Sequence, residues 1–354
     1  MRRLGASIVA LLLAGTPAFG QQPRTSPIAI DTDAAADRAV DENGVSTGNL
    51  IFDALVTVGV GSHVEAVARP FVQRLTSGEW NKQIWVAELR YQRTGPVGVR
   101  VEGGLIPSPV GYANLLLRPH LNPTIALPSS LFTPLPVFER GAPRVDLLGA
   151  VYAYGVASTV AATHWDARAA VIDTSPLRPR RIFSPTNPPH VYNTVVGGGV
   201  TPFVGFRVGA TYTYGGWLRA GEAPGVTSDE DARILSIESE FAFRYTKIAG
   251  EWTHDGIQTT GGDRTASGWF VQGQQTLTPR WFAAGRVEHM QAPALTAVTG
   301  VFDEQHFNGT EEVIGFRVNR EITVRAGHRA REVFGRPGFA HSAEVSVVWW
   351  RRWF

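Results

Sequence analysis

The feature that most constrains this chain is an alternation of apolar and polar residues that recurs from about residue 49 to the C-terminus. In 204–214, Val, Phe, Ala and Tyr occupy every second position, and Arg207 and Thr211 lie between them. Because successive side chains of a β-strand point to opposite faces of a sheet, this period predicts strands with one apolar and one polar face. The chain is therefore expected to be all-β.

The length of the alternating segments separates a membrane barrel from a soluble sandwich. The segments run for about 9–15 residues, whereas strands of soluble domains are commonly five or six residues long. A tilted strand needs roughly 9–11 residues to cross a membrane. Tight turns also alternate with longer loops, which are expected at about 174–190, 215–231, 259–266, 292–310 and 332–340. One end of tight turns and one of long loops is typical of transmembrane β-barrels.

The number of strands can be narrowed by parity. Fifteen candidates are visible, near 49–61, 63–75, 82–93, 97–106, 144–163, 165–173, 191–200, 203–214, 232–246, 250–258, 267–277, 280–291, 311–319, 321–331 and 341–354. An antiparallel barrel cannot close on an odd number, and bacterial single-chain barrels have even counts. We therefore predict a sixteen-stranded antiparallel barrel, with fourteen strands as the alternative. The missing strand could lie before residue 49, within 107–143 or in 144–163.

The N-terminal region does not alternate. Residues 1–20 combine Arg2 and Arg3, a short apolar run and a terminal Ala-Phe-Gly, which predicts a secretory signal peptide cleaved before Gln21. Residues 21–47 are rich in Pro, Ala and Asp and are expected to form a flexible periplasmic leader. This organisation assigns residues 48–354 to the barrel and places the protein in the outer membrane of a Gram-negative bacterium.

The C-terminus ends VSVVWWRRWF. It resembles the terminal strand of outer-membrane barrels, which finishes in Phe and is recognised by the barrel assembly machinery. Phe354 is the residue that carries this resemblance. Trp350 and Val348 form one apolar face of the segment, and Trp349 and Val347 form the other, so the sequence leaves open which face meets lipid.

The polar faces should line an aqueous interior, since a barrel of sixteen strands is wide enough to leave a channel. The residues expected to line the pore are Arg69, Arg90, Arg100, Glu102, Arg168, Arg207, Glu238, Glu240, Arg244, Arg286, Glu288, Arg317, Arg325 and Arg329. Glu65, Glu88, Asp166, Glu251 and Asp255 share their faces. The near balance of charge predicts weak ion selectivity, with an anion bias only if the narrowest point is basic. Alternatively, these residues pair across strands and stabilise a solvated wall.

The longest stretch without alternation is 107–143. It holds seven prolines before Pro143, so it cannot be a regular strand throughout. Its many Leu and Phe residues should not remain exposed to water, and we expect the stretch to pack inside the barrel and narrow it. The candidate constriction residues are Arg118, His120, Glu139 and Arg140. The alternative is an extracellular cap or a partner contact.

The chain as a whole resembles Gram-negative outer-membrane porins. A local likeness to the phosphate-selective porin group lies in 103–111, where a strand runs through Gly-Gly into Pro-Ser-Pro-Val-Gly. The lysine ladder of that group is missing, since the chain has only Lys82 and Lys247. The resemblance implies a channel for passive diffusion of small hydrophilic solutes or ions, with no cofactor. It also implies contact with outer-membrane lipid and lipopolysaccharide, and leaves a homotrimer open.

Other classes of function find less support in the residues. The chain has no Cys, which excludes thiol catalysis and cysteine-ligated metals, and its His residues are scattered, so we expect no metal site. The arginines are dispersed among acids, unlike the basic patch of a nucleic-acid-binding protein. No hydrolase motif is found, and a site built from His254, Asp255 and Glu288 would lack a placed Ser. We therefore expect no enzyme. The alternatives are a non-channel barrel, either an adhesin-like scaffold or a barrel enzyme, and a soluble exported β-protein that binds glycans.

Overall fold

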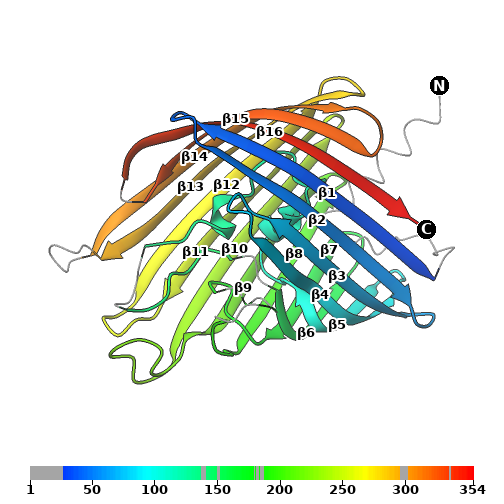
Figure 1. The fold of residues 1–354 in the computed structure, drawn as a ribbon. Helices are drawn as coiled ribbons and strands as arrows, with labels where there is room; N and C mark the ends of the chain where they lie inside the picture. The colour runs from blue at the N-terminus through cyan, green and yellow to red at the C-terminus, as the bar shows by residue number, and fades with distance from the viewer. Residues whose placement is uncertain are drawn as a thin grey trace.

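Sixteen antiparallel strands form one closed barrel in the computed structural model (Figure 1). The structure describes residues 27–136, 141–149, 152–178, 180, 183, 187–295, 302–334 and 336–354. Each strand pairs with its neighbours in sequence, and β1 pairs with β16 to close the ring. The predictions of an all-β barrel and of sixteen strands are confirmed.

The strands are β1 (Ile28–Asp41), β2 (Ser46–Gly59), β3 (Val64–Arg74), β4 (Trp80–Arg93), β5 (Gly98–Pro107), β6 (Tyr152–Ala161), β7 (Trp165–Ile172), β8 (Asn193–Phe203), β9 (Phe206–Leu218), β10 (Glu230–Phe243), β11 (Thr246–Ile257), β12 (Arg264–Thr276), β13 (Trp281–Leu295), β14 (Phe302–Arg317), β15 (Ile322–Val333) and β16 (Arg336–Trp353). Two short 3-10 helices, η1 (Ala113–Leu117) and η2 (Ser129–Leu131), lie between β5 and β6. Among the described residues, no helix is long and apolar enough to cross a membrane.

The strand that the sequence missed is β1. It lies in the segment predicted to be a flexible leader, and that prediction is wrong for residues 28–47. Asp31, Asp33 and Asp37 share one face of β1, but the run of small alanines at 34–36 and Arg38 on the opposite face weaken its hydrophobic signal. Residues 1–26, which include the predicted signal peptide, lie outside the described residues.

Several connections differ from those predicted. β14 begins at Phe302 and β16 at Arg336, so most of the loops expected over 292–310 and 332–340 are strand. Only the later part of the candidate strand 144–163 forms a strand, which is β6. Residues 141–149 belong instead to the segment that folds inside the barrel. The strands extend past the apolar band that a membrane requires, and their polar ends read as loops in the sequence.

The two faces of the barrel follow the alternation. Val345 and Val347 of β16 are about half exposed and point outward, whereas Ser346 and Val348 are buried on the inner face. Trp349 therefore faces outward with the valines, which answers the question that the sequence left open. Phe354 lies just beyond β16 and is 81% exposed.

The segment between β5 and β6, which we call the interior segment, folds into the barrel (Figure 1). Ala113, Leu116 and Leu117 of η1 and Leu131 of η2 are buried against wall residues, including Phe270 of β12. Packing of this kind removes the Leu-rich surface from water. The prediction that this segment packs inside the barrel is confirmed by these contacts.

Candidate pore and its lining

Carboxylates of the barrel wall hold the interior segment by its backbone. Glu251 of β11 accepts hydrogen bonds from the N–H groups of Tyr112 and Ala113, at 3.0 and 2.8 Å. Glu311 of β14 accepts from the N–H groups of Ile125 and Ala126, at 2.6 and 3.0 Å. The wall therefore anchors the segment at two points.

A third anchor joins Glu288 of β13 to the start of η2. Its carboxylate accepts from the N–H of Ser129 at 2.8 Å and from the Ser129 hydroxyl at 2.6 Å. Glu288 was predicted to line the pore. It does face the lumen, but its oxygens are used to fix the interior segment.

Two wall arginines complete the set of anchors. Arg286 donates to the Thr124 hydroxyl at 2.8 Å and to the Ala126 carbonyl at 2.9 Å. Arg325 donates to the carbonyls of Asn122 and Thr124, at 2.7 and 2.5 Å. Both were predicted to line the pore, and both instead lie beneath the segment, buried with only 2–3% of their surface exposed.

Two of the predicted constriction residues meet at the fully buried Asp33 of β1. Arg118 donates to Asp33 at 2.5 Å, and the His120 ring is hydrogen bonded to the other carboxylate oxygen. His120 also stacks on Trp350 of β16, with ring centroids 5.1 Å apart. Glu139 and Arg140, the other two candidates, lie outside the described residues.

A second buried ion pair lies on the neighbouring wall. Arg69 of β3 donates to Asp53 of β2 at 3.0 Å and to the Tyr152 hydroxyl at 3.0 Å. Its guanidinium lies 4.8 Å above the centre of the Trp85 ring. Arg69 was predicted to line the pore, and it does reach the lumen cavity described next.

The lumen cavity is a space of about 320 Å³ between the interior segment and strands β3–β10. Six arginines and three acids line it: Arg69, Arg90, Arg100, Arg118, Arg168, Arg207, Glu102, Asp166 and Glu238. Most of the wall residues belong to the part of each strand near the barrel end where β1 begins and β16 finishes. We call this end the terminus end, and the opposite one the long-loop end. The lining has more arginines than acids, although the whole chain is close to balance.

The arginines of the lumen cavity bind carboxylates on their own strand and on nearby strands. Arg90 donates to Glu88 at 2.6 Å and to Glu102 at 3.0 Å. Arg207 donates to Asp166 at 3.1 Å and to Glu238 at 2.6 Å. The alternative that these charges pair across strands is therefore observed, and it coexists with an open cavity.

The guanidiniums are more exposed than most of the carboxylates that they bind. The side chains of Arg100 and Arg168 are 20% and 21% exposed, against 6% for Glu102 and 7% for Glu238. Asp166, at 19%, and Glu65, at 20%, are the exceptions. Water in the cavity therefore meets mainly positive charge.

Glycines of β8 make room for this arginine layer. A Cβ at Gly197 would lie 3.1 Å from the Arg168 side chain, and one at Gly199 would lie 2.6 Å from that of Arg207. The Gly197-Gly198-Gly199 run, which the sequence marks as a crowded strand, thus lets two guanidiniums lie flat against the wall.

Besides Arg286, Glu288 and Arg325, four more predicted pore residues lie outside the lumen cavity. Arg244 is in the tight turn between β10 and β11 with a φ of 52°, so the prediction that it lines the pore is wrong. The alternation of β10 ends at Phe243, one residue before Arg244. Arg317, at the terminus end of β14, lies over the Phe282 ring. Glu240 pairs with Lys247 at 2.9 Å. Arg329 lines a separate cavity of about 300 Å³ beside residues 125–133.

An apolar cluster covers part of the long-loop end. Leu147 and Leu148 of the interior segment pack with Leu177, Trp217 and other buried residues of the loops and strand ends. The Trp217 ring N–H donates to the Gln258 carbonyl at 2.8 Å. The interior segment therefore covers part of this end as well as narrowing the barrel.

The residues considered for a hydrolase site do not meet. The His254 ring stacks on Trp252, which alternates to the outer face, whereas Asp255 and Glu288 are buried on the inner face. Within the described ranges, no group of three or more His, Cys, Asp or Glu side chains could hold a metal ion.

The sequence did not single out Asp33, Asp53 or Glu311. Asp33 lay in the supposed leader, although its period of two with Asp31 and Asp37 was a usable signal. Asp53 and Glu311 belong to predicted strands, but each finds its partner on another strand or in the interior segment.

Comparison with solved structures shows which known barrels this architecture resembles. OmpF of Salmonella typhi, solved with daunomycin, matches 92% of this chain and 97% of its own at a TM-score of 0.62 and 10% identity. OmpT, an outer membrane protein of Vibrio cholerae, matches 93% and 99% at 0.60 and 9%. A third structure, described as a porin, matches 92% and 100% at 0.51 and 12%. The chain has the fold of an outer-membrane porin. No family model and no curated protein matches this porin-like barrel in sequence.

Proposed function

We propose that this porin-like barrel is a channel for the passive diffusion of small hydrophilic solutes or ions across the outer membrane of a Gram-negative bacterium. The observation that carries the proposal is the lumen cavity, a polar space bounded by charged wall residues and by the interior segment. An N-terminal signal peptide cleaved after export fits this location. The proposal assigns no catalytic role to any residue and requires no cofactor or metal.

The arrangement of charges in the lumen cavity favours anions over cations. Arg100 and Arg168 are more exposed than Glu102 and Glu238, so a solute in the cavity meets guanidiniums first. A guanidinium remains charged at every relevant pH. Rings of Arg or Lys favour anions in channels. We therefore propose a moderate anion preference, in place of the weak selectivity expected from net charge.

The apolar cluster at the long-loop end supports a second candidate, a plugged barrel that serves as a scaffold. Leu147, Leu148 and Trp217 are buried there in one apolar cluster. The two candidates differ in one measurable property, which is stable conductance.

Planar-bilayer recording of the purified full chain tests both candidates. The channel proposal expects discrete conductance steps and a reversal potential that favours anions in a salt gradient. Replacing Arg168 and Arg207 with Gln should shift that potential toward cations. Arg233→Gln is the matched control, since Arg233 is an exposed residue on the outer face of β10. Absence of stable conductance from correctly folded protein would favour the plugged scaffold.

The partners follow from the same proposal. We propose that outer-membrane lipid and lipopolysaccharide surround the barrel, that the barrel assembly machinery inserts it, and that it forms a homotrimer. Cross-linking in native membranes tests the trimer.

A further inference from the structure

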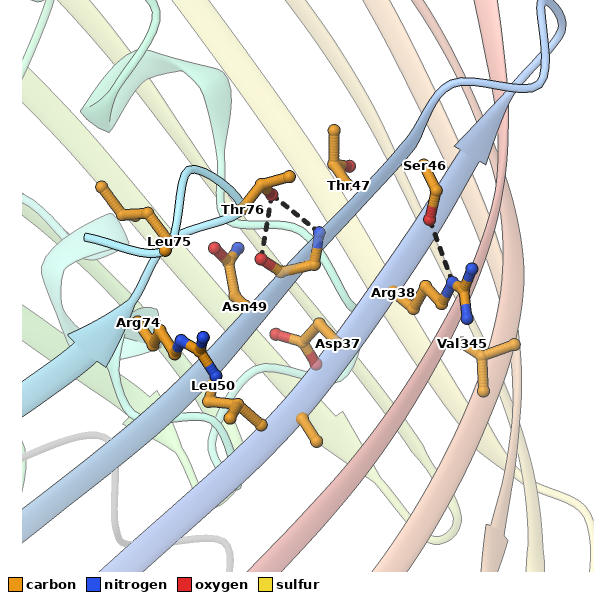
Figure 2. A pocket seen from close by; sticks show the side chains of 13 residues that line it. Asp37, Arg38, Ser46, Thr47, Asn49, Leu50, Arg74, Leu75, Thr76 and Val345 are labelled. Atoms are coloured by element: carbon orange, nitrogen blue, oxygen red, sulfur yellow. Dashed lines mark hydrogen bonds between the residues drawn. The ribbon is translucent and has the colours of Figure 1, made fainter. Parts of the chain in front are cut away.

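A groove of about 430 Å³ lies at the long-loop rim, over β1, β2 and the turn after β3 (Figure 2). We call it the rim groove. Its floor is low because Ala36 and Gly48 present little or no side chain. Leu50 and Val345 border it and belong to the outward, apolar face of the barrel. The rim groove therefore opens toward the membrane side of the wall rather than toward the lumen.

Two arginines flank the rim groove. Arg38 lies on β1 and Arg74 at the end of β3, two strand spacings or about 10 Å apart across the sheet and two residues apart along it. Arg38 donates to the Ser46 hydroxyl at 3.0 Å, and Arg74 lies 5.9 Å from the centre of the Trp80 ring. Within the described part of the chain, neither guanidinium forms an ion pair. They differ in this from most arginines of the lumen.

The polar groups of the rim groove are held in place. The Thr76 hydroxyl donates to the Gly48 carbonyl at 2.9 Å and accepts from the Gly48 N–H at 2.8 Å (Figure 2). This contact ties the turn after β3 to β2 and fixes that side of the groove. Asp37 is the one acid among the lining residues, and alternation along β1 turns it toward the lumen. Two arginines against one acid leave the rim groove positive.

We propose that the rim groove binds the phosphorylated headgroup of a membrane lipid. Arg38 and Arg74 would contact phosphate oxygens, since guanidinium geometry suits phosphate. The acyl chains would run down the wall over Leu50 and Val345. A basic site at the level of the headgroups, above an apolar surface, matches the chemistry of an anionic lipid. The inference does not depend on whether the barrel conducts.

Lipid binding to the full chain in phosphatidylcholine nanodiscs tests this site. The probes are fluorescent dioleoyl phosphatidic acid and dioleoylglycerol, which share acyl chains and differ in the phosphate. We expect the protein to bind phosphatidic acid in preference to dioleoylglycerol. The R38Q/R74Q variant should bind phosphatidic acid roughly tenfold more weakly, because each surface arginine attracts an anionic lipid. Arg233→Gln, which changes an exposed arginine of β10 on the other side of the barrel, should bind as the wild type does.

A second variant keeps both charges. Ala36→Phe fills the floor of the rim groove with the arginines intact, and it should also weaken binding of phosphatidic acid. Heat-modifiable gel migration shows that each variant is folded. Equal binding of the two probes, or wild-type affinity in both R38Q/R74Q and Ala36→Phe, would overturn the proposal. So would displacement of the lipid by micromolar inorganic phosphate, which would identify a site for the free anion.

Discussion

Arg286 and Glu311 form an ion pair inside the barrel, with 2.9 Å between Nη2 and Oε2 and only 1% and 2% of their side chains exposed. The pair joins β13 to β14, and each partner also binds the interior segment near Ala126. The lumen charges of this barrel therefore have two roles. Some hold the segment in place, and others face the lumen cavity.

Arg286→Met should destabilise the barrel and loosen the interior segment. The change leaves Glu311 buried without its partner, and breaking a buried pair in this way costs about 3–5 kcal/mol. Urea unfolding followed by tryptophan fluorescence measures the loss. Glu321→Gln is the control, because the exposed Glu321–Arg351 pair at 3.7 Å should contribute only about 0–1 kcal/mol. Equal losses in the two variants would contradict an anchoring role for Arg286.

Gly199→Ala should alter ion selectivity and should also strain the sheet locally, since the new Cβ would lie 2.9 Å from the Val208 carbonyl oxygen. Its Cβ would lie 2.6 Å from the Arg207 guanidinium, which must move away from Asp166. The reversal potential in a salt gradient reports that movement. Gly256→Ala is the matched change in β11, since no atom lies within 4 Å of its Cβ. A reversal potential that stays at the wild-type value in Gly199→Ala would show that Arg207 does not set selectivity.

The contact between Arg178 and Glu222 in the long loops should open in acid. Burial alone would raise the pKa of Glu222, but hydrogen bonds from Arg178 and from the Arg219 N–H, together with their charges, bring it below its ordinary value of 4.5. Because the pKa of Glu222 is lower in the folded protein, its ionised form stabilises the closed loops fully above the ordinary value of 4.5. This stabilisation is lost as the pH falls through the lowered pKa. Hydrogen exchange of residues 219–226 should therefore quicken below about pH 4.5, after correction for the intrinsic rate. Glu222→Gln should remove this acid step, and a step that persists would point to another group.

Deletion of Phe354 should slow assembly without lowering the stability of the folded barrel. Phe354 is 81% exposed and lies beyond the last paired residue of β16, so the fold gains little from its side chain. Insertion into membranes in cells reports assembly, and refolding in detergent followed by urea unfolding reports stability. A matched loss of both would mean that Phe354 acts through packing rather than recognition.

Alternation alone was enough to assign the faces of most strands. Arg207 faces the lumen and Tyr212 the membrane side, because the period of two is a local property of the backbone. Parity then required an even number of strands, sixteen or fourteen, where fifteen could be seen. The sequence did not locate that strand, since the alanines of β1 resemble a linker until β2 and β16 pair with them.

The sequence by itself therefore determined the all-β barrel, the even number of its strands and the placement of the proline-rich segment inside it. Only the tertiary structure decided which lumen charges are free to meet a solute. Ser129 meets Glu288 across 159 residues of chain, and Arg325 meets Thr124 across 201. Contacts at such separations depend on how the closed sheet brings distant strands and the interior segment together, and local pattern carries no record of them.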